Sequence, residues 1–167
     1  MTGSAQAVFL VGFMGVGKST AGRALARLLD WEFIDLDERI VATDGRSIEQ
    51  IFREAGEPHF RRLEAGILAS LQARPRIVVA CGGGTYAQPA NRERIAMMGP
   101  AVWIELPLET ALLRCGGSAG RPLLHSVSQA EALYRRRLPA YRTAPLHVNA
   151  GGLEPEAVAE AIARILP

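Results

Sequence analysis

The amino-acid sequence predicts an α/β fold in which helices cover a parallel sheet. Two observations lead to this prediction. Short, mostly apolar runs alternate along the chain with longer segments of helical periodicity. The first apolar run, residues 8–11, leads directly into a glycine-rich loop and then a helix, an order typical of the first strand of such sheets. Ligands of these folds bind beyond the carboxyl ends of the strands, so that edge is where function is expected.

The predicted strands are runs of three to five residues, each too short for a helix and several rich in β-branched residues. Each run is followed within two positions by glycine, cysteine, proline, or an acidic or amide residue. In chain order they are VFLV at 8–11, EFI at 32–34, IVVA at 77–80, AVWIE at 101–105 and LHV at 146–148.

The predicted helices are longer segments with apolar residues three or four positions apart. In the first, Ala21 and Leu25 lie on one side and Arg23 and Arg27 on the other. Ser47 is expected to cap a later helix. Further helices are predicted at 37–43, 47–55, 57–71, 89–98, 108–114, 128–141 and 154–166. Neither repeats nor linkers interrupt this order, so one domain, 1–167, is expected.

Composition and charge exclude several classes of protein. The chain has 167 residues and a net charge of +2, too small to indicate a nucleic-acid or membrane partner. Cys81 and Cys115 are far apart and lack metal-type spacing, which indicates neither a disulfide nor a zinc site and favours the cytoplasm. The N-terminus has no basic leader, so no signal peptide is expected, and no apolar stretch is long enough to span a bilayer.

Lys18 is the only lysine among 19 basic residues, the others being arginine. A codon bias of the source genome would explain the arginines, and it makes the exception informative. Residues 12–19, GFMGVGKS, fit the phosphate-loop pattern G-x-x-x-x-G-K-[ST] between a predicted strand and helix. Lysine, a compact charge on a flexible stem, suits the β- and γ-phosphates better than a planar arginine.

The phosphate loop predicts a nucleoside triphosphate site. Its backbone N–H groups are expected to surround phosphate oxygens at the positive end of the following helix. The Ser19 hydroxyl is placed to bind Mg²⁺. The residues expected to bind the nucleotide are Gly15, Val16, Gly17, Lys18, Ser19 and Thr20.

Acidic and basic residues elsewhere suggest a second substrate site. Asp37 could accept a hydrogen bond from an attacking hydroxyl, or it could cap the next helix. Asp35 could reach Mg²⁺ through water, or it could be a buried partner for an arginine. Two arginine runs, 61–62 and 135–137, could be solvated surface, or one arginine of each could converge on a carboxylate.

Gly82, Gly83 and Gly84 follow the predicted strand at 77–80. Three consecutive glycines are costly because glycine loses more backbone freedom on folding than any other residue. A tight turn needs one glycine or two. We therefore expect a bound molecule, rather than protein, to approach this backbone. The aperiodic stretch at 115–127, which carries Arg121, is interpreted as a lid.

The sequence resembles the shikimate kinase family along residues 8–166. The shared motifs, in the order and spacing of the family, are GFMGVGKST, DLD, GRSIEQIFREAGEPHFRRLE, CGGG, RPLL and RRRLPAY. The resemblance implies a P-loop kinase fold of the nucleoside-monophosphate-kinase type, with three α/β/α layers, a five-stranded parallel sheet in the order 2-3-1-4-5 and a lid loop. It implies an enzyme that uses ATP and Mg²⁺ to phosphorylate the 3-hydroxyl of shikimate, in aromatic amino acid biosynthesis. A monomer is expected.

The resemblance also implies roles for individual residues on the acceptor side. Asp37 would hold the reacting hydroxyl, and Arg61 and Arg137 would bind the acceptor carboxylate. Gly83 would let the backbone contact the oxygens of the ring.

On the nucleotide side, the resemblance implies that Lys18 and Arg121 bind the phosphates, with Arg121 reaching them from the lid. Ser19 and Asp35 would serve Mg²⁺, Asp35 through water. One departure from the family is Asn149, where an acid is usual, in a loop expected to border the adenine.

Other functions were weighed against this one. Another small-molecule kinase of the same fold, for gluconate or aminoshikimate, would also need arginines for a carboxylate. A nucleotide-dependent regulatory module would bind without transferring phosphate. A GTPase of that kind is excluded, because its Asn-Lys-x-Asp motif needs a second lysine that the chain lacks.

Overall fold

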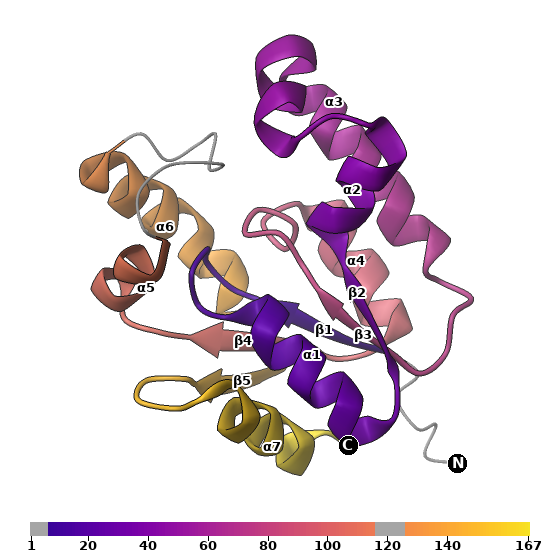
Figure 1. Ribbon diagram of the computed structural model, residues 1–167, viewed down its shortest axis with the longest axis vertical. Helices are drawn as coiled ribbons and strands as arrows, with labels where there is room; N and C mark the ends of the chain where they lie inside the picture. Colours follow the sequence, from indigo (N-terminus) through magenta and orange to yellow (C-terminus); the bar gives the residue numbers. More distant parts are fainter. Residues whose placement is uncertain (1–6, 116–125) are drawn as a thin grey trace.

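Five parallel strands form the predicted sheet (Figure 1). The computed structural model describes residues 7–115 and 126–167. The strand order is β2-β3-β1-β4-β5, which confirms the predicted topology. The strands are β1 (Ala7–Val11), β2 (Glu32–Asp35), β3 (Ile77–Ala80), β4 (Ala101–Glu105) and β5 (Leu146–Asn149).

Helices connect the strands and cover the sheet. Figure 1 shows α1 and α7 packed side by side in front of the sheet, α4 behind it, and α2 and α3 together as a lobe at one end. The helices are α1 (Lys18–Leu29), α2 (Leu36–Asp44), α3 (Ile48–Ser70), α4 (Pro89–Met98), α5 (Leu108–Cys115), α6 (Val127–Tyr141) and α7 (Pro155–Ile165). The predicted lid at 115–127 falls almost entirely on residues 116–125, which lie outside the described residues.

The helix boundaries differ from the sequence prediction most clearly in α3. The helical segments predicted at 47–55 and 57–71 are parts of α3, which is kinked at Gly56. Gly56 has φ 82° and ψ 164°, a left-handed backbone that glycine adopts readily, and Pro58 follows. Ser47 caps α3 as predicted, accepting a hydrogen bond from the Gln50 N–H at 3.1 Å.

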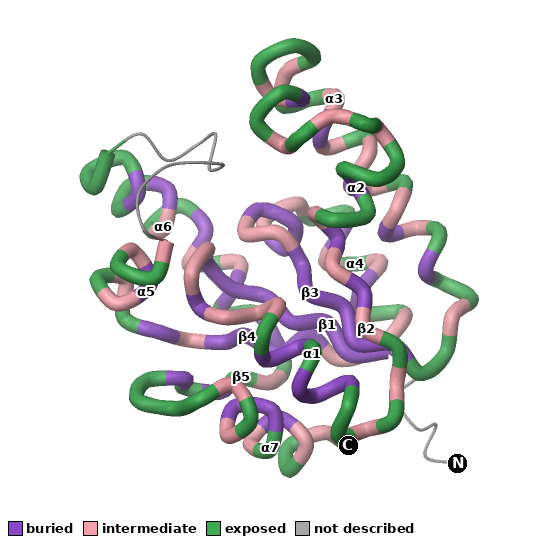
Figure 2. Tube along the Cα trace, viewed as in Figure 1, coloured by how far each residue is buried: buried purple, intermediate pink, exposed green. Residues whose placement is uncertain are grey.

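The main core lies on both faces of the sheet. All residues of β1 and β3 are buried, as expected for central parallel strands covered on two sides (Figure 2). In α1 the predicted apolar face is buried at Ala21 and Leu25. The α2–α3 lobe has a small core of its own, formed by Ile40, Ile51 and Phe60.

The strand register aligns the loops at the carboxyl edge. Leu10 of β1 and Asp35 of β2 both pair with Ala80 of β3. The phosphate loop, the start of α2 and the glycine turn therefore begin at the same level of the sheet. Within the described residues, no helix combines the length and apolar character needed to cross a membrane.

Candidate active site

The phosphate loop joins β1 to α1. Lys18 is the first residue of α1, and its Nζ donates hydrogen bonds to the carbonyl oxygens of Gly12 at 2.7 Å and Phe13 at 2.8 Å. The ammonium group thus lies over the loop that precedes it. This places the only lysine of the chain at the mouth of the predicted triphosphate site.

Glycine is required in this loop for two reasons. Gly15 and Gly17 have φ angles of 79° and 91°, in the left-handed region that side chains disfavour. In addition, a Cβ on Gly15 would overlap the carbonyl oxygen of Ala111 in α5, and a Cβ on Gly12 would lie 2.8 Å from that of Ile104. The loop is therefore held against β4 and α5, a constraint that the sequence pattern alone did not indicate.

Ser19 and Asp35 meet where α1 faces the end of β2. The Ser19 hydroxyl donates to Oδ2 of Asp35 at 2.5 Å. These are hard oxygen donors of the type that Mg²⁺ prefers. Among the described residues, no group of three or more His, Cys, Asp or Glu could hold a metal. The pair suits a Mg²⁺ that takes its remaining ligands from phosphates and water, as Mg²⁺ usually does.

The start of α2 distinguishes the roles of the two aspartates. Asp35 is the N-cap, and its Oδ1 accepts a hydrogen bond from the Glu38 N–H at 3.2 Å. Asp37 lies in the first turn of α2, so the alternative that Asp37 caps this helix is wrong. The helix begins one residue earlier than predicted because Asp35, rather than Asp37, has the extended backbone of a cap.

Functional side chains converge on the glycine turn after β3. A Cβ placed on Gly82 would lie 3.0 Å from Oδ1 of Asp37. One on Gly83 would lie 3.0 Å from Nη1 of Arg137. One on Gly84 would lie 2.5 Å from Nη2 of Arg61. The predicted acceptor residues therefore come together from α2, α3 and α6.

This convergence corrects the expectation that only a bound molecule approaches the three glycines. The atoms nearest to the missing Cβ positions belong to protein side chains. The glycines leave room for an aspartate and two guanidinium groups against the backbone. A larger residue at Gly84 would have to displace Arg61 and Arg137 together, because the Nη2 of Arg137 also lies 2.9 Å from that position.

One arginine from each run points into the site. Arg62, Arg135 and Arg136 are exposed, whereas Arg137 is 7% exposed and Arg61 is partly buried. One arginine of each run therefore approaches Gly84 while its neighbours are exposed, which agrees with the alternative in which one arginine of each run converges. Adjacent residues on a helix point in different directions, which separates the site arginines from their neighbours.

Buried Glu64 anchors Arg61. Its carboxylate is 1% exposed and accepts from the Nη1 of Arg61 at 3.0 Å and from the Thr85 hydroxyl at 2.7 Å. Glu57 accepts from Nη2 of Arg61 at 3.1 Å on the more exposed side. Glu64 lies within the FRRLE motif, but sequence reasoning gave it no role, because only the fold brings Thr85 to it.

Arg137 is buried beside Tyr141, one turn further along α6. Burial lowers the pKa of the Arg137 guanidinium, and nearby Arg61 lowers it further. Burial raises the pKa of Tyr141 to about 12, so its hydroxyl stays protonated and donates to the carbonyl oxygen of Gly83 at 2.5 Å. Two positive groups held close together in a partly dry site favour an anionic ligand between them.

A cavity of about 310 Å³ joins the two halves of the site. It is lined by Met14, Gly15, Gly17, Lys18, Ser19, Thr20, Asp35, Asp37, Cys81, Gly82, Gly83 and Arg114. A larger cavity of about 610 Å³ lies at the opposite, amino end of the strands and contains none of the predicted site residues.

Arg114 is a site residue that sequence reasoning missed. It lies in the last turn of α5, and its Nη1 would be 3.7 Å from a Cβ on Gly17. Arg121 itself lies outside the described residues. Asn149 accepts a hydrogen bond from the Gly151 N–H at 2.9 Å, closing a local turn.

Replacing Tyr141 with Phe should lower the free energy of unfolding by about 1 kcal/mol, because the partly buried Gly83 carbonyl loses its donor. Urea denaturation followed by circular dichroism measures this. The control is Tyr134→Phe in the same helix, because phenylalanine keeps the ring contact between position 134 and Phe13. Equal stability of Tyr141→Phe and the wild type would contradict the assigned hydrogen bond.

Comparisons with known proteins agree with this geometry. Residues 14–167 match the model of the shikimate kinase family. A shikimate kinase of Persephonella marina is 38% identical over 160 residues, covering 95% of this chain and 98% of its own length. One from Thermus thermophilus is 42% identical over 159 residues, covering 93% of this chain and 86% of its own.

A solved structure of a shikimate kinase has the same fold as this chain. The shikimate kinase from Acinetobacter baumannii in complex with shikimate superposes with a TM-score of 0.91 at 35% identity, covering 96% of this chain and 92% of its own. A gluconokinase from Sinorhizobium meliloti reaches a TM-score of 0.58 at 19% identity, covering 97% of this chain and 94% of its own. This likeness shows a shared fold only. With a phosphate loop, an aspartate and two convergent arginines at one edge of the sheet, the chain belongs to the shikimate kinase family.

Proposed function

We propose that this chain transfers the γ-phosphate of ATP to the 3-hydroxyl of shikimate, giving shikimate 3-phosphate. The observation that carries the proposal is the convergence of Asp37, Arg61 and Arg137 on the glycine turn, next to the cavity that contains the phosphate loop. The relative from Acinetobacter baumannii was solved in complex with shikimate, a small anionic polyol that such a site would suit.

On the acceptor side, Arg61 and Arg137 would bind the carboxylate. Each guanidinium is a planar fork that can make paired hydrogen bonds to a carboxylate, and the negative charge would relieve the repulsion between them. Asp37 would accept a hydrogen bond from the reacting hydroxyl and orient it for in-line attack. Gly83 would bring its backbone to the oxygens of the ring.

On the nucleotide side, the residues mainly position and neutralise phosphate. The amides of Gly15 to Thr20 and the Lys18 ammonium would bind the phosphates, with Arg121 from the lid and Arg114 from α5 adding charge. Phosphoryl transfer passes through a loose transition state with negative charge on the equatorial oxygens, which these cations would stabilise. Mg²⁺, held by Ser19 and through water by Asp35, would neutralise charge between the phosphates.

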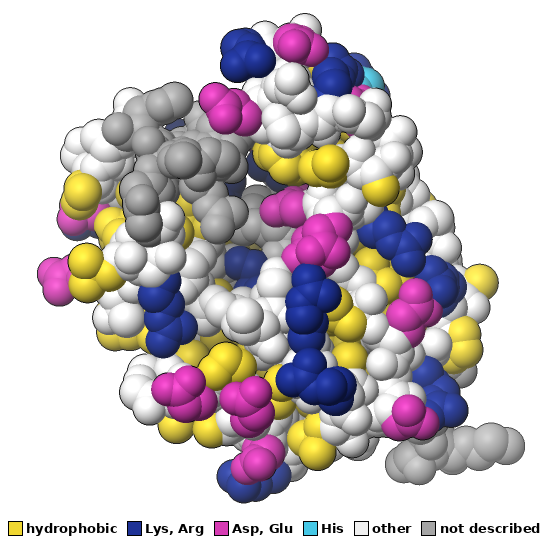
Figure 3. Space-filling view, viewed as in Figure 1, with side chains coloured by type: hydrophobic (Ala, Val, Ile, Leu, Met, Phe, Trp, Pro, Cys, Tyr) yellow, Lys and Arg dark blue, Asp and Glu magenta, His cyan; other side chains and the backbone are white. Residues whose placement is uncertain are grey.

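We also propose that the protein acts as a cytoplasmic monomer without nucleic-acid or membrane partners. Both cysteines, Cys81 and Cys115, are free thiols, as expected in a reducing compartment. On the face shown in Figure 3, basic side chains over α1 lie against acidic ones over α2, and Arg23 donates to Glu38 at 2.8 Å.

A coupled ADP-release assay tests the function. The purified protein is supplied with ATP, Mg²⁺ and either shikimate or gluconate. We expect ADP release that depends on shikimate. Turnover of gluconate without shikimate would assign a different acceptor, and ATP binding with neither turnover would indicate a binding module.

Lys18→Arg should lower kcat about tenfold or more, because a planar guanidinium cannot reproduce the position of the ammonium over the loop. The KM for shikimate should change little. Steady-state kinetics at saturating ATP measure both values, and unchanged turnover would contradict the role given to this lysine.

Arg61→Ala and Arg137→Ala should each raise the KM for shikimate about tenfold or more, with a smaller effect on kcat, because they remove carboxylate contacts. Arg62→Ala and Arg136→Ala are matched controls, since these neighbours are exposed. Similar KM values in the site and control variants would argue against carboxylate binding by the converging pair.

A further inference from the structure

The α2–α3 lobe supplies both Asp37 and Arg61, yet it packs largely on itself. Its core of Ile40, Ile51 and Phe60 is separate from the main core. Figures 1 and 2 show the lobe standing at the end of the sheet with much of its surface exposed. The geometry of the acceptor site therefore depends on how the parts of this lobe are held together.

The kink in α3 is the weak point of this arrangement. At Gly56 the backbone leaves helical geometry, and Pro58 provides no N–H for a helical hydrogen bond. Glu54 lies before the kink, whereas His59 and Arg61 lie after it. The segment that carries Arg61 is held by Phe60 in the lobe core and by Glu64, which bonds to Thr85. A further restraint across Gly56 would fix the direction of this segment relative to the start of α3.

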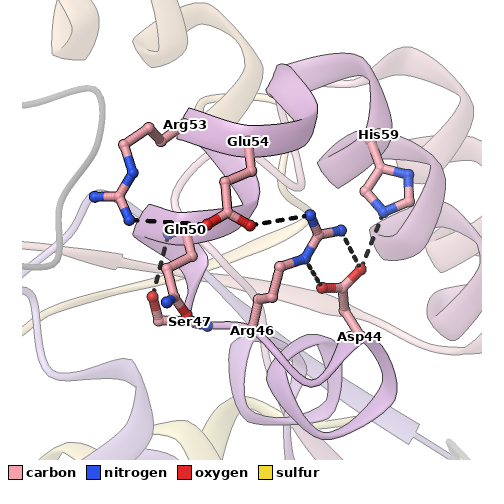
Figure 4. Close-up of polar contacts among 7 residues, drawn as sticks. All are labelled: Asp44, Arg46, Ser47, Gln50, Arg53, Glu54 and His59. Atoms are coloured by element: carbon pink, nitrogen blue, oxygen red, sulfur yellow. Dashed lines mark hydrogen bonds and ion pairs between the residues drawn. The ribbon is translucent and has the colours of Figure 1, made fainter.

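A charged cluster bridges the kink (Figure 4). Arg46, in the turn between α2 and α3, donates from Nε to Oδ1 of Asp44 at 2.6 Å and from Nη2 to Oδ2 at 3.0 Å. Its Nη1 donates to Glu54, before the kink, at 3.5 Å. Nε2 of His59, after the kink, lies 3.0 Å from Oδ2 of Asp44. The cluster thus connects both arms of α3 to the end of α2.

The Asp44 carboxylate is the centre of the cluster. Its side chain is 7% exposed, compared with 32% for Arg46 and 31% for His59. Hydrogen bonds from Arg46 and His59 hold the pKa of Asp44 well below its usual range, and Asp44 raises the pKa of Arg46. Because Asp44 stays ionised, Nε2 of His59 must carry a proton to bond to it.

The charged groups around His59 in this cluster are Asp44 from α2, Arg46 from the turn, and Glu54 from α3, with Arg53 further out, 4.0 Å from Glu54. His59 is the member of this cluster that lies after the kink, so its contact with Asp44 joins that arm of α3 to the end of α2.

We propose that Asp44 and His59 form a clamp across the kink of α3 that positions Arg61 for the acceptor carboxylate. His59 is a positioning residue in this proposal, because it lies two residues from Arg61 in the arm that the clamp restrains. The clamp rests on the proposed function. Releasing it would let Arg61 spread over more positions, which weakens acceptor binding but leaves the phosphate loop unaffected.

The test compares His59→Ala and His59→Gln with the wild type by steady-state kinetics. His59→Ala should raise the KM for shikimate about fivefold, with kcat and the KM for ATP within about twofold of the wild type. His59→Gln should bring the KM for shikimate most of the way back to the wild-type value, because its amide can still donate a hydrogen bond to Asp44. Arg53→Gln is the matched control at the exposed edge of the cluster and should match the wild type.

The split between KM and kcat, together with the rescue by His59→Gln, separates a clamp from a merely structural role. A loss of folded protein would lower kcat without raising the KM for shikimate alone. Thermal unfolding, read as Tm, verifies that each variant is folded.

Three outcomes would overturn the clamp: a wild-type KM for shikimate in His59→Ala, an equal rise in its KM for ATP, or a KM for shikimate in His59→Gln as high as in His59→Ala. If the wild type releases ADP with shikimate and any of these results is found, only the clamp is wrong. A wild type that releases no ADP with shikimate would instead overturn the proposed function, and the clamp with it.

Discussion

The pairing of β3 with both β1 and β2 is the constraint on which the rest of the site depends. Because Leu10 and Asp35 both pair with Ala80, three loops leave the sheet at one level. The phosphate loop, the Asp35 cap and the glycine turn are adjacent as a consequence of register alone. A parallel sheet brings these loops together because all its strands end on the same edge.

Glycine serves different purposes in the two halves of the site. In the phosphate loop, Gly15 and Gly17 adopt left-handed backbone, and the absence of a Cβ lets α5 approach. In the turn after β3, the φ angles of the three glycines are not in that region, and their value lies in the space that they leave. That space is taken by the side chains of Asp37, Arg61 and Arg137.

The fold was predictable from the sequence because its signals are local. Apolar runs, the phosphate-loop pattern and Ser47 as a cap each depend on residues a few positions apart, and the structure confirms them. The errors are also local. The start of α2 was placed one residue late, because Asp35 and Asp37 are equally suitable as caps by residue type.

The candidate site was predictable only in part, for a reason that lies in how each half is assembled. The phosphate loop of the nucleotide side is one continuous segment, so its spacing is visible in the sequence, whereas Arg114 lies on a different helix and was missed. The acceptor side combines α2, α3, the β3 turn and α6, and its contacts span long distances along the chain, as between Glu64 and Thr85 or Tyr141 and Gly83. Helical periodicity could indicate that one arginine of a run faces inward, but only tertiary packing determines which one is buried. The same packing leaves Arg137 charged in a dry environment beside Arg61, a costly arrangement that makes physical sense when an anion binds between them.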